Sequence, residues 1–111
     1  MIEGRYNHGW RGEGMAYNVP DVVLQDISRF AEKHGIRRVL LFGSRARGTQ
    51  TERSDIDLAV CGGDFDGFYW DIKEHAHSLL MIDVVNLDAG VSDNLQRELE
   101  RDGVTLYEKV G

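Results

Sequence analysis

The sequence predicts a small domain of the α/β (α+β) class, in which a mixed β-sheet is flanked by helices. Short apolar runs rich in strand-forming residues alternate along the chain with segments whose apolar residues recur at helical spacing. The chain has 111 residues, which suits one domain with a core of its own. Glycines and N-capping residues separate these segments, so most boundaries have a local cause.

The first expected helix begins at Pro20 and ends at Gly35, because proline suits a first helical turn and glycine commonly follows a last one. Its apolar stripe consists of Val22, Val23, Ile27, Phe30 and Ala31. The next segment, Val39–Phe42, is a short apolar run that predicts a buried strand cut off by Gly43.

A second strand is expected over Asp55–Val60, and the pair Gly62-Gly63 ends it. The following helix is indicated by apolar residues at helical spacing, namely Phe68, Ile72, Ala76, Leu79 and Leu80. Two histidines on it, His75 and His77, are not expected to share a metal, since residues two apart on a helix face different directions.

The last elements are a strand, a helix and a final strand. The strand lies within the apolar segment Leu79–Leu87, which it shares in part with the end of the preceding helix. Ser92 is placed to cap the last helix and Gly103 to end it, with Leu95 and Leu99 on its apolar side. Val104–Tyr107 then reads as a short strand.

The most informative motif joins the run Gly43–Gly48 to the segment Ser54–Asp57, in the pattern Gly-Ser-x10-Asp-x-Asp. A tight turn at Gly43-Ser44 that opens a short helix directs backbone N–H groups and the Ser44 hydroxyl at phosphate oxygens. The second half of the motif supplies carboxylates for a metal ion. A phosphate-binding turn coupled to metal-binding acids indicates nucleotidyl transfer.

Asp55 and Asp57 share one face of their strand, where they can hold one Mg²⁺ or bridge a pair of ions. A third acid is expected at Asp83, the only charged residue in the apolar segment Leu79–Leu87. A lone aspartate in such a strand is costly unless it is paired or metal-bound. If the two strands are neighbours, the three carboxylates converge, and a divalent cation removes their mutual repulsion.

Each part of this motif also has an ordinary structural interpretation. The Gly-Ser turn is compatible with a simple strand-to-helix connection, and Ser54-Asp55 with a capping pair. Asp83 is compatible with a partly exposed strand end. Arg45 and Arg47 fit solvated helix charges as well as phosphate ligands. The fixed spacing of the whole motif favours the functional interpretation.

The composition of the chain limits the classes of partner that it is expected to bind. The formal net charge is −6, so direct binding of nucleic acid and templated synthesis are not expected. No apolar run has the length of a membrane span, and no signal peptide opens the chain. The single Cys61 fits a reducing compartment, so we expect a cytoplasmic protein without a membrane partner. The sequence leaves homo- and hetero-oligomers open.

Residues 1–14 lack periodicity and contain four glycines, which predicts a flexible leader. The string Ile2–Arg5 resembles a protease site used in expression vectors, and Met15 is a candidate natural start. The expected domain is therefore 15–111.

Over residues 20–110 the chain resembles the minimal nucleotidyltransferases (MNT) of the DNA polymerase β-like superfamily, and within it the antitoxin halves of HEPN/MNT toxin–antitoxin pairs. The resemblance implies the polymerase β-like nucleotidyltransferase fold and Mg²⁺ as cofactor, with two ions expected. It also implies ATP as the substrate. The implied nucleotide-binding residues are Gly43, Ser44, Arg45 and Arg47, and the implied catalytic and metal-binding acids are Asp55, Asp57 and Asp83.

The same resemblance implies transfer of AMP to a tyrosine hydroxyl of a HEPN-domain ribonuclease toxin, which silences the toxin. Two alternatives stay open. One is transfer to a small-molecule hydroxyl, as in aminoglycoside nucleotidyltransferases, although the chain is too short for a separate substrate-binding domain. The other is a non-catalytic antitoxin that masks its partner.

Overall fold

The computed structural model describes residues 4–5, 15–16 and 18–110. The helices are α1 (Asp21–Lys33), α2 (Ser44–Arg47), α3 (Phe65–His75) and α4 (Asp93–Asp102), with a 3₁₀ turn, η1, at Leu87–Ala89. The strands are β1 (Gly4–Arg5), β2 (Met15–Ala16), β3 (Val19–Pro20), β4 (Arg38–Phe42), β5 (Ile56–Cys61), β6 (Ile82–Asn86) and β7 (Val104–Lys109). The order of helices and strands from α1 onward agrees with the sequence prediction.

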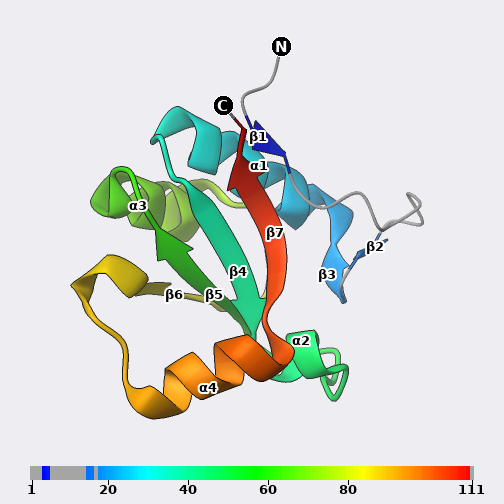
Figure 1. The fold of residues 1–111 in the computed structure, drawn as a ribbon. Helices are drawn as coiled ribbons and strands as arrows, with labels where there is room; N and C mark the ends of the chain where they lie inside the picture. The colour runs from blue at the N-terminus through cyan, green and yellow to red at the C-terminus, as the bar shows by residue number, and fades with distance from the viewer. Residues whose placement is uncertain (1–3, 6–14, 17, 111) are drawn as a thin grey trace.

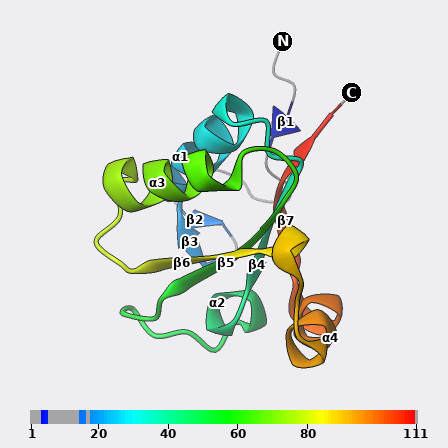
Figure 2. The same ribbon diagram turned by 90° about the vertical axis from the view of Figure 1, so that its left-hand side faces the viewer.

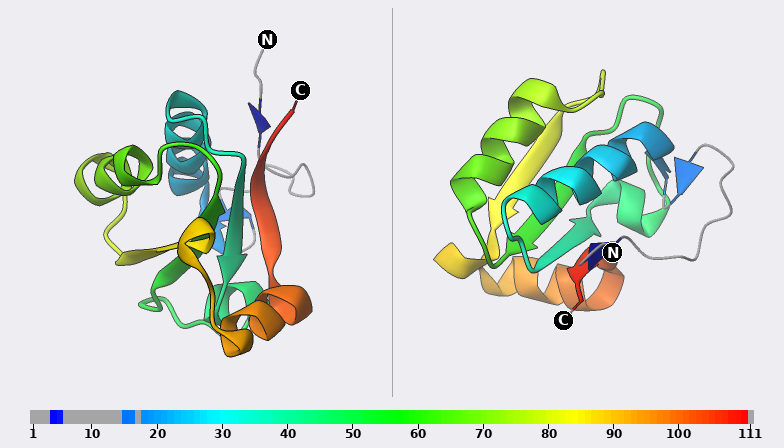
Figure 3. Two further views of the ribbon diagram at one scale, coloured as in Figure 1. Left: turned by 60° about the vertical axis from the view of Figure 1, so that its left-hand side comes forward. Right: turned by 90° about the horizontal axis from the view of Figure 1, so that it is seen from above.

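The main sheet has five strands in the order β1-β7-β4-β5-β6 and is mixed, as predicted (Figure 1). Strand β4 runs antiparallel to both β5 and β7, whereas β5 and β6 are parallel and are joined by the crossover helix α3. Helices α1 and α3 pack side by side on one face of the sheet (Figure 2). The short α2 and α4 lie beyond the end where β4 finishes (Figure 3).

The core lies between this sheet and the α1–α3 layer. In β4, Val39 and Leu41 are fully buried, while Leu40 and Phe42 are half-buried on the opposite face. The same alternation directs Asp57 of β5 away from the core. The sheet thus has one face committed to packing and one that carries polar chemistry.

The apolar stripe predicted for α1 is confirmed at four of its five positions. The inclusion of Val22 was wrong, because its side chain is 45% exposed and Leu24 is buried in the helix interface instead. The buried set of apolar residues is Val23, Leu24, Ile27, Phe30 and Ala31. The stripe is therefore rotated slightly from the predicted one.

Helix α3 ends at His75, before the predicted residues Leu79 and Leu80, because Ala76 adopts an extended backbone with φ −71° and ψ 141°. The backbone N–H of His77 donates to Asp26 Oδ2 at 2.6 Å rather than to a helical carbonyl. Leu79 is consequently fully exposed. The prediction that the helix continues to Leu80 was wrong because of this tertiary hydrogen bond.

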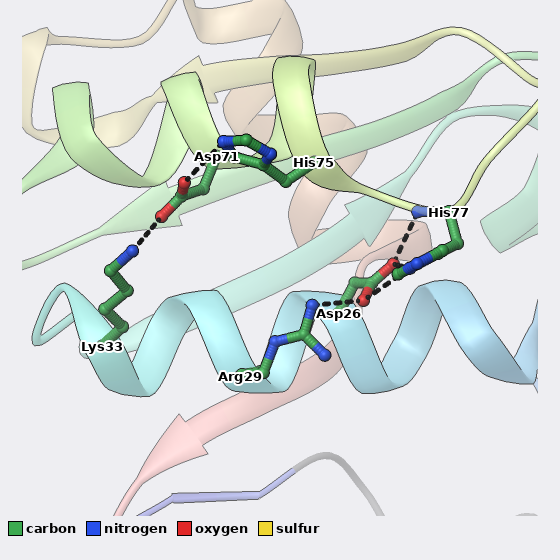
Figure 4. Close-up of polar contacts among 6 residues, drawn as sticks. All are labelled: Asp26, Arg29, Lys33, Asp71, His75 and His77. Carbon is green, nitrogen blue, oxygen red and sulfur yellow. Dashed lines mark hydrogen bonds and ion pairs between the residues drawn. The ribbon is translucent and has the colours of Figure 1, made fainter.

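Asp26 on α1 accepts the hydrogen bond that holds the loop after α3, and its side chain is almost fully buried. It also contacts the ring Nδ1 of His77 at 3.0 Å and the guanidinium of Arg29 at 2.8 Å (Figure 4). These contacts satisfy a carboxylate that would otherwise be costly to bury. The loop after α3 is thereby fixed against α1.

Asp71 forms a second tie between the two helices of this layer. It contacts His34 Nε2 at 2.6 Å and Lys33 Nζ at 3.1 Å, and His75 lies 3.8 Å away. The hydrogen bond from His34, followed by that from Lys33, lowers the pKa of the Asp71 carboxyl. The contacts of Asp71 with His34 and Lys33 therefore stabilise the fold at neutral pH and weaken as acid protonates Asp71.

Most of the predicted leader, residues 1–14, lies outside the described residues. Its exception is Gly4–Arg5, whose backbone pairs with Lys109 and Glu108 of β7. Across the part of the chain that the structure describes, helices long and apolar enough to cross a membrane are absent.

We expect Asp26→Ala to lower the free energy of unfolding by about 3 kcal/mol, because it leaves the His77 N–H, the His77 ring and the Arg29 guanidinium without their acceptor. His77→Ala is the matched control: it removes the exposed ring but keeps the backbone N–H on Asp26. Urea denaturation of both variants measures the difference. Equal losses would show that the ring, and not the backbone hydrogen bond, holds the loop.

Candidate active site

The predicted site residues gather where three segments meet: the turn after β4, the start of β5 and the start of β6. Asp57 pairs in register with Phe42 of β4 on one side and with Asp83 of β6 on the other. The two acid-bearing strands are therefore neighbours, which is the condition for the three carboxylates to converge. Asp55 precedes the first residue of β5 and is exposed.

Gly43 lies directly against the Asp57 carboxylate. It is buried and has a φ of +78°, in the region that favours glycine. A Cβ at this position would stand 2.3 Å from Asp57 Oδ2, which is closer than non-bonded atoms can approach. The glycine of the motif is thus required twice, by its backbone conformation and by the acid that packs on it.

The electrostatic environment of Asp57 is strongly negative. Partial burial is the main cause that raises the pKa of its carboxyl, and the charges of Asp83, Asp55 and Glu98 raise it further. Arg47 acts in the opposite direction and lowers this pKa. The site therefore carries a surplus of carboxylates that a cation would neutralise.

The donor set of Asp55, Asp57 and Asp83 consists only of carboxylate oxygens, which suits a hard divalent cation such as Mg²⁺. As the side chains stand, no group of three histidine, cysteine, aspartate or glutamate residues within the described ranges is close enough to hold a metal ion. The fit to the ion therefore rests on the chemistry of the donors and on the register that places Asp57 beside Asp83.

Asp83 differs from the prediction in one respect. It was expected inside an apolar strand, but β6 is the edge strand of the sheet and Asp83 is exposed on it. The argument from the cost of burial was therefore wrong. Its exposure leaves Asp83 accessible to an incoming molecule.

Arg45 is only 3% exposed and its guanidinium is occupied by the chain itself. It donates to the backbone carbonyls of Asn18, Thr51, Glu52 and Ser54. In return, the Asn18 side-chain amide donates to the Arg45 carbonyl at 3.1 Å. These contacts hold the loop that connects the Gly43-Ser44 turn to Asp55. We accordingly assign Arg45 to the support of this loop and remove it from the candidate phosphate ligands.

Arg47 and Glu98 form a pair that the sequence did not reveal. Arg47 Nη1 lies 3.1 Å from Glu98 Oε2, and the Gly43 backbone N–H donates to that same oxygen at 3.1 Å. The signal was present but weak: Glu98 shares the inward side of α4 with Leu95 and Leu99 and, like them, is half-buried. An acid on the apolar side of a helix is the pattern that would have identified it.

A cavity of about 660 Å³ lies between the loops that lead into the acid-bearing strands. One wall is the loop before Asp55, and another is the loop after α3 that leads into β6. The lining residues are Pro20, Val23, Arg45, Gln50, Thr51, Glu52, His77, Ser78, Leu79 and Leu80. Its lining includes none of Asp55, Asp57 and Asp83. Pro20 and the buried Val23 place the cavity on the helix-covered side of the sheet, whereas Asp57 points away from the core.

The chain is also similar to known proteins. Residues 25–110 match the family model described as polymerase beta, nucleotidyltransferase. The chain is 27% identical over 88 residues to MJ0128 of Methanocaldococcus jannaschii, which is named as a candidate protein adenylyltransferase; the match covers 76% of this chain and 90% of MJ0128. MJ0604 of the same organism, named likewise, is 56% identical over 32 residues, or 28% of this chain and 32% of MJ0604.

Solved structures of toxin–antitoxin complexes are similar as well. One contains AMP-PNP and matches with a TM-score of 0.58 and 27% identity over 74% of this chain and 70% of the other. An MntA–HpeT complex in which two aspartates two residues apart are replaced by glutamate matches with a TM-score of 0.58 and 25% identity, with the same coverage. Another MntA–HpeT variant, with a tyrosine replaced by alanine, has a TM-score of 0.56 and 28% identity over 74% of this chain and 69% of the other.

We expect Gly43→Ala to cost at least about 2 kcal/mol of folding stability, because the new methyl group collides with Asp57 in addition to straining the backbone. Gly48→Ala is the matched control. Its φ is +81°, yet nothing lies within 4 Å of the position that its new methyl group would take, so only backbone strain of about 1 kcal/mol applies. Denaturant titration compares the two. Equal costs would contradict the close approach of Gly43 to Asp57.

We expect Asp57→Asn to raise the Tm of the ligand-free protein at pH 7. A carboxyl whose pKa is raised by folding destabilises the fold once it ionises, and this penalty grows as pH rises from its ordinary pKa of 3.8 through the raised value. The gain should disappear in more acidic solution, where Asp57 is protonated in both states. Thermal melts across this pH range measure it, with Glu74→Gln on α3 as a control for the loss of one exposed charge.

Proposed function

The chain belongs to the polymerase β nucleotidyltransferase family, and on that basis we propose that it transfers AMP from ATP to a hydroxyl of a partner toxin and so acts as an antitoxin. The observation that carries the proposal is the contact of the Gly43-Ser44 turn with Asp57, flanked by Asp55 and Asp83. This arrangement places the proposed phosphate-binding turn against Asp57, which pairs in register with Asp83.

In this proposal the turn binds the triphosphate. The Ser44 hydroxyl and the backbone N–H groups of the turn donate to phosphate oxygens, and the partly exposed Arg47 adds a charge-assisted contact. Arg45 acts indirectly, because it fixes the loop between the turn and Asp55. The proposed nucleotide ligands are therefore Gly43, Ser44 and Arg47.

The acids Asp55, Asp57 and Asp83 would hold Mg²⁺, with two ions proposed from the resemblance to minimal nucleotidyltransferases. When bound, the metal supplies charge neutralisation for the phosphoryl oxygens and the leaving group. The environment of Asp57 supports this assignment: after burial, the charges of Asp83, Asp55 and Glu98 raise its pKa, and such an excess of carboxylate charge favours a cation. By holding the ion in a fixed place, the three acids would also position the α-phosphate for attack.

The reaction is an in-line displacement. The acceptor oxygen forms a bond to the α-phosphorus, the bond to the bridging oxygen of pyrophosphate breaks, and pyrophosphate leaves. The hydroxyl proton passes to a base, for which Asp83 is the candidate because it is exposed at the sheet edge beside Asp57.

The finer proposal is that the acceptor is a tyrosine of a HEPN-domain ribonuclease toxin in the cytoplasm. It is supported by the similar toxin–antitoxin complexes, one with AMP-PNP and one altered at a tyrosine, and by the relatives named for protein adenylylation. A net charge of −6 argues for a protein partner over a nucleic-acid one.

Masking of the partner without catalysis is the second candidate. It is favoured by apolar side chains that are exposed near the site, in particular Leu79 at 106% and Met81 at 59%. Both residues lie in the loop that leads into Asp83. A bound partner can cover these side chains and reach the acids together, so masking and transfer are compatible.

The test is intact-mass spectrometry of a HEPN-like toxin encoded beside this chain, incubated with the chain, ATP and Mg²⁺. We expect the toxin to gain one or more AMP units, and tandem mass spectrometry to place them on tyrosine. Asp57→Asn should abolish the gain, whereas Glu74→Gln should retain it. Omission of Mg²⁺ in the presence of a chelator should also abolish it.

An unmodified toxin that nevertheless forms a stable complex and loses its ribonuclease activity would support masking and contradict the transfer. A modified lysine or serine would contradict the tyrosine assignment alone. Loss of activity with Asp57→Asn is interpretable because that variant is expected to fold at least as stably as the wild type.

A further inference from the structure

The carboxylate of Glu98 is hydrogen-bonded to two donors that the proposed function assigns to the nucleotide phosphates. Its Oε2 accepts hydrogen bonds from the Gly43 backbone N–H and from Arg47 Nη1, both at 3.1 Å. Glu98 comes from α4, 55 positions after Gly43 in the chain. An anionic oxygen held by a turn N–H and a guanidinium has the chemistry of a bound phosphate oxygen.

We propose that Glu98 is a built-in competitor of the nucleotide, which holds Gly43 and Arg47 until a triphosphate binds and displaces it. The inference rests on the proposed function and concerns the regulation of the same site. Its consequence is that nucleotide binding frees the inner side of α4 from the phosphate turn.

Displacement follows from the geometry of the donors. The Gly43 N–H is a single donor and already makes a hydrogen bond to Glu98. A triphosphate oxygen cannot take that position while a carboxylate oxygen fills it, because two anionic oxygens in contact repel strongly. Glu98 also lies near enough to Asp57 to be one of the charges that raise its pKa. Removal of Glu98 from the turn would thus lower the negative potential that meets an incoming triphosphate.

Helix α4 is built so that this release is feasible. None of its residues is buried, and its apolar contacts are limited to half-buried side chains such as Leu95 and Leu99. The Ser92 side chain caps the helix independently by accepting from the Leu95 N–H at 3.1 Å. The helix can therefore persist while the Glu98 side chain rotates away. Arg47, at 39% exposure, is then available to a phosphate.

A purely structural role for Glu98 makes the opposite prediction. If Glu98 served only to fasten α4 to the turn, its removal would loosen the turn and leave nucleotide affinity unchanged or weaker. As a competitor, its removal tightens binding. The two roles are therefore separated by the sign of the affinity change.

The experiment is calorimetric titration of the whole chain with a non-hydrolysable ATP analogue and, separately, with inorganic tripolyphosphate, each with Mg²⁺. The variants are Glu98→Gln, which keeps the shape but removes the charge, and Glu98→Ala. Glu100→Gln, on the exposed side of the same helix, controls for the change in net charge. We expect both Glu98 variants to bind both probes about tenfold tighter than the wild type, in line with a charge-assisted hydrogen bond. Glu100→Gln should bind like the wild type.

A second readout is hydrogen exchange of the Gly43 amide. We expect it to be protected in the nucleotide-free wild type, to lose protection in Glu98→Ala and to regain it when the ATP analogue is added. Protection of the amides of the paired strands β4 and β5 in the same experiment shows that the variants are folded. Glu98→Gln provides the affinity measurement if Glu98→Ala is unstable.

Folded Glu98 variants that bind the probes equally well or more weakly than the wild type would overturn the competitor role and leave the proposed function intact. The same holds if Glu100→Gln tightens binding as much as Glu98→Gln, since the effect would then be one of net charge. If neither the wild type nor any variant binds the ATP analogue, the proposed function fails and the competitor role fails with it.

Discussion

The contact between Gly43 and Asp57 is the constraint on which the site depends. Because a Cβ at Gly43 would lie 2.3 Å from Asp57 Oδ2, the turn after β4 can pass the start of β5 only with glycine there. Register then fixes the rest, since Asp57 pairs with Phe42 on one side and with Asp83 on the other. The close approach of Gly43 to Asp57 thus brings the proposed phosphate donors next to the carboxylates.

Buried polar groups stabilise the segments around this contact. Arg45 binds three carbonyls of the loop and that of Asn18, so the part of the motif between Ser44 and Asp55 follows a defined path. Asp26 similarly fixes the chain reversal before β6 through the His77 N–H. In both cases a buried charge is hydrogen-bonded by the chain, which makes the backbone conformation around it specific as well as stable.

The sequence was sufficient to predict a structural feature wherever that feature is determined by residues close to it in the chain. The periodicity of α1, the Ser92 cap and the alternation in β5 are visible in the letters, and the Gly-Ser-x10-Asp-x-Asp spacing identified most of the candidate site. The sequence was insufficient where a contact with a residue far away in the chain determines the structure. The end of α3 depends on Asp26, the burial of Arg45 on Asn18, and the position of Glu98 on how α4 crosses the sheet end. Such contacts span 27 to 55 positions and leave no periodic trace.

The distribution of charge explains why acids surround a site proposed to bind an anion. Burial is the main cause that raises the pKa of Asp57; the charges of Asp83, Asp55 and Glu98 raise it further, and Arg47 lowers it. The three aspartates gather at the start of β5 and β6, where a bound cation would reverse the local charge for the triphosphate. Glu98 differs because it already accepts from the phosphate donors. Without nucleotide, those donors are balanced by the protein's own carboxylate, which a triphosphate has to replace if Glu98 is the competitor proposed here.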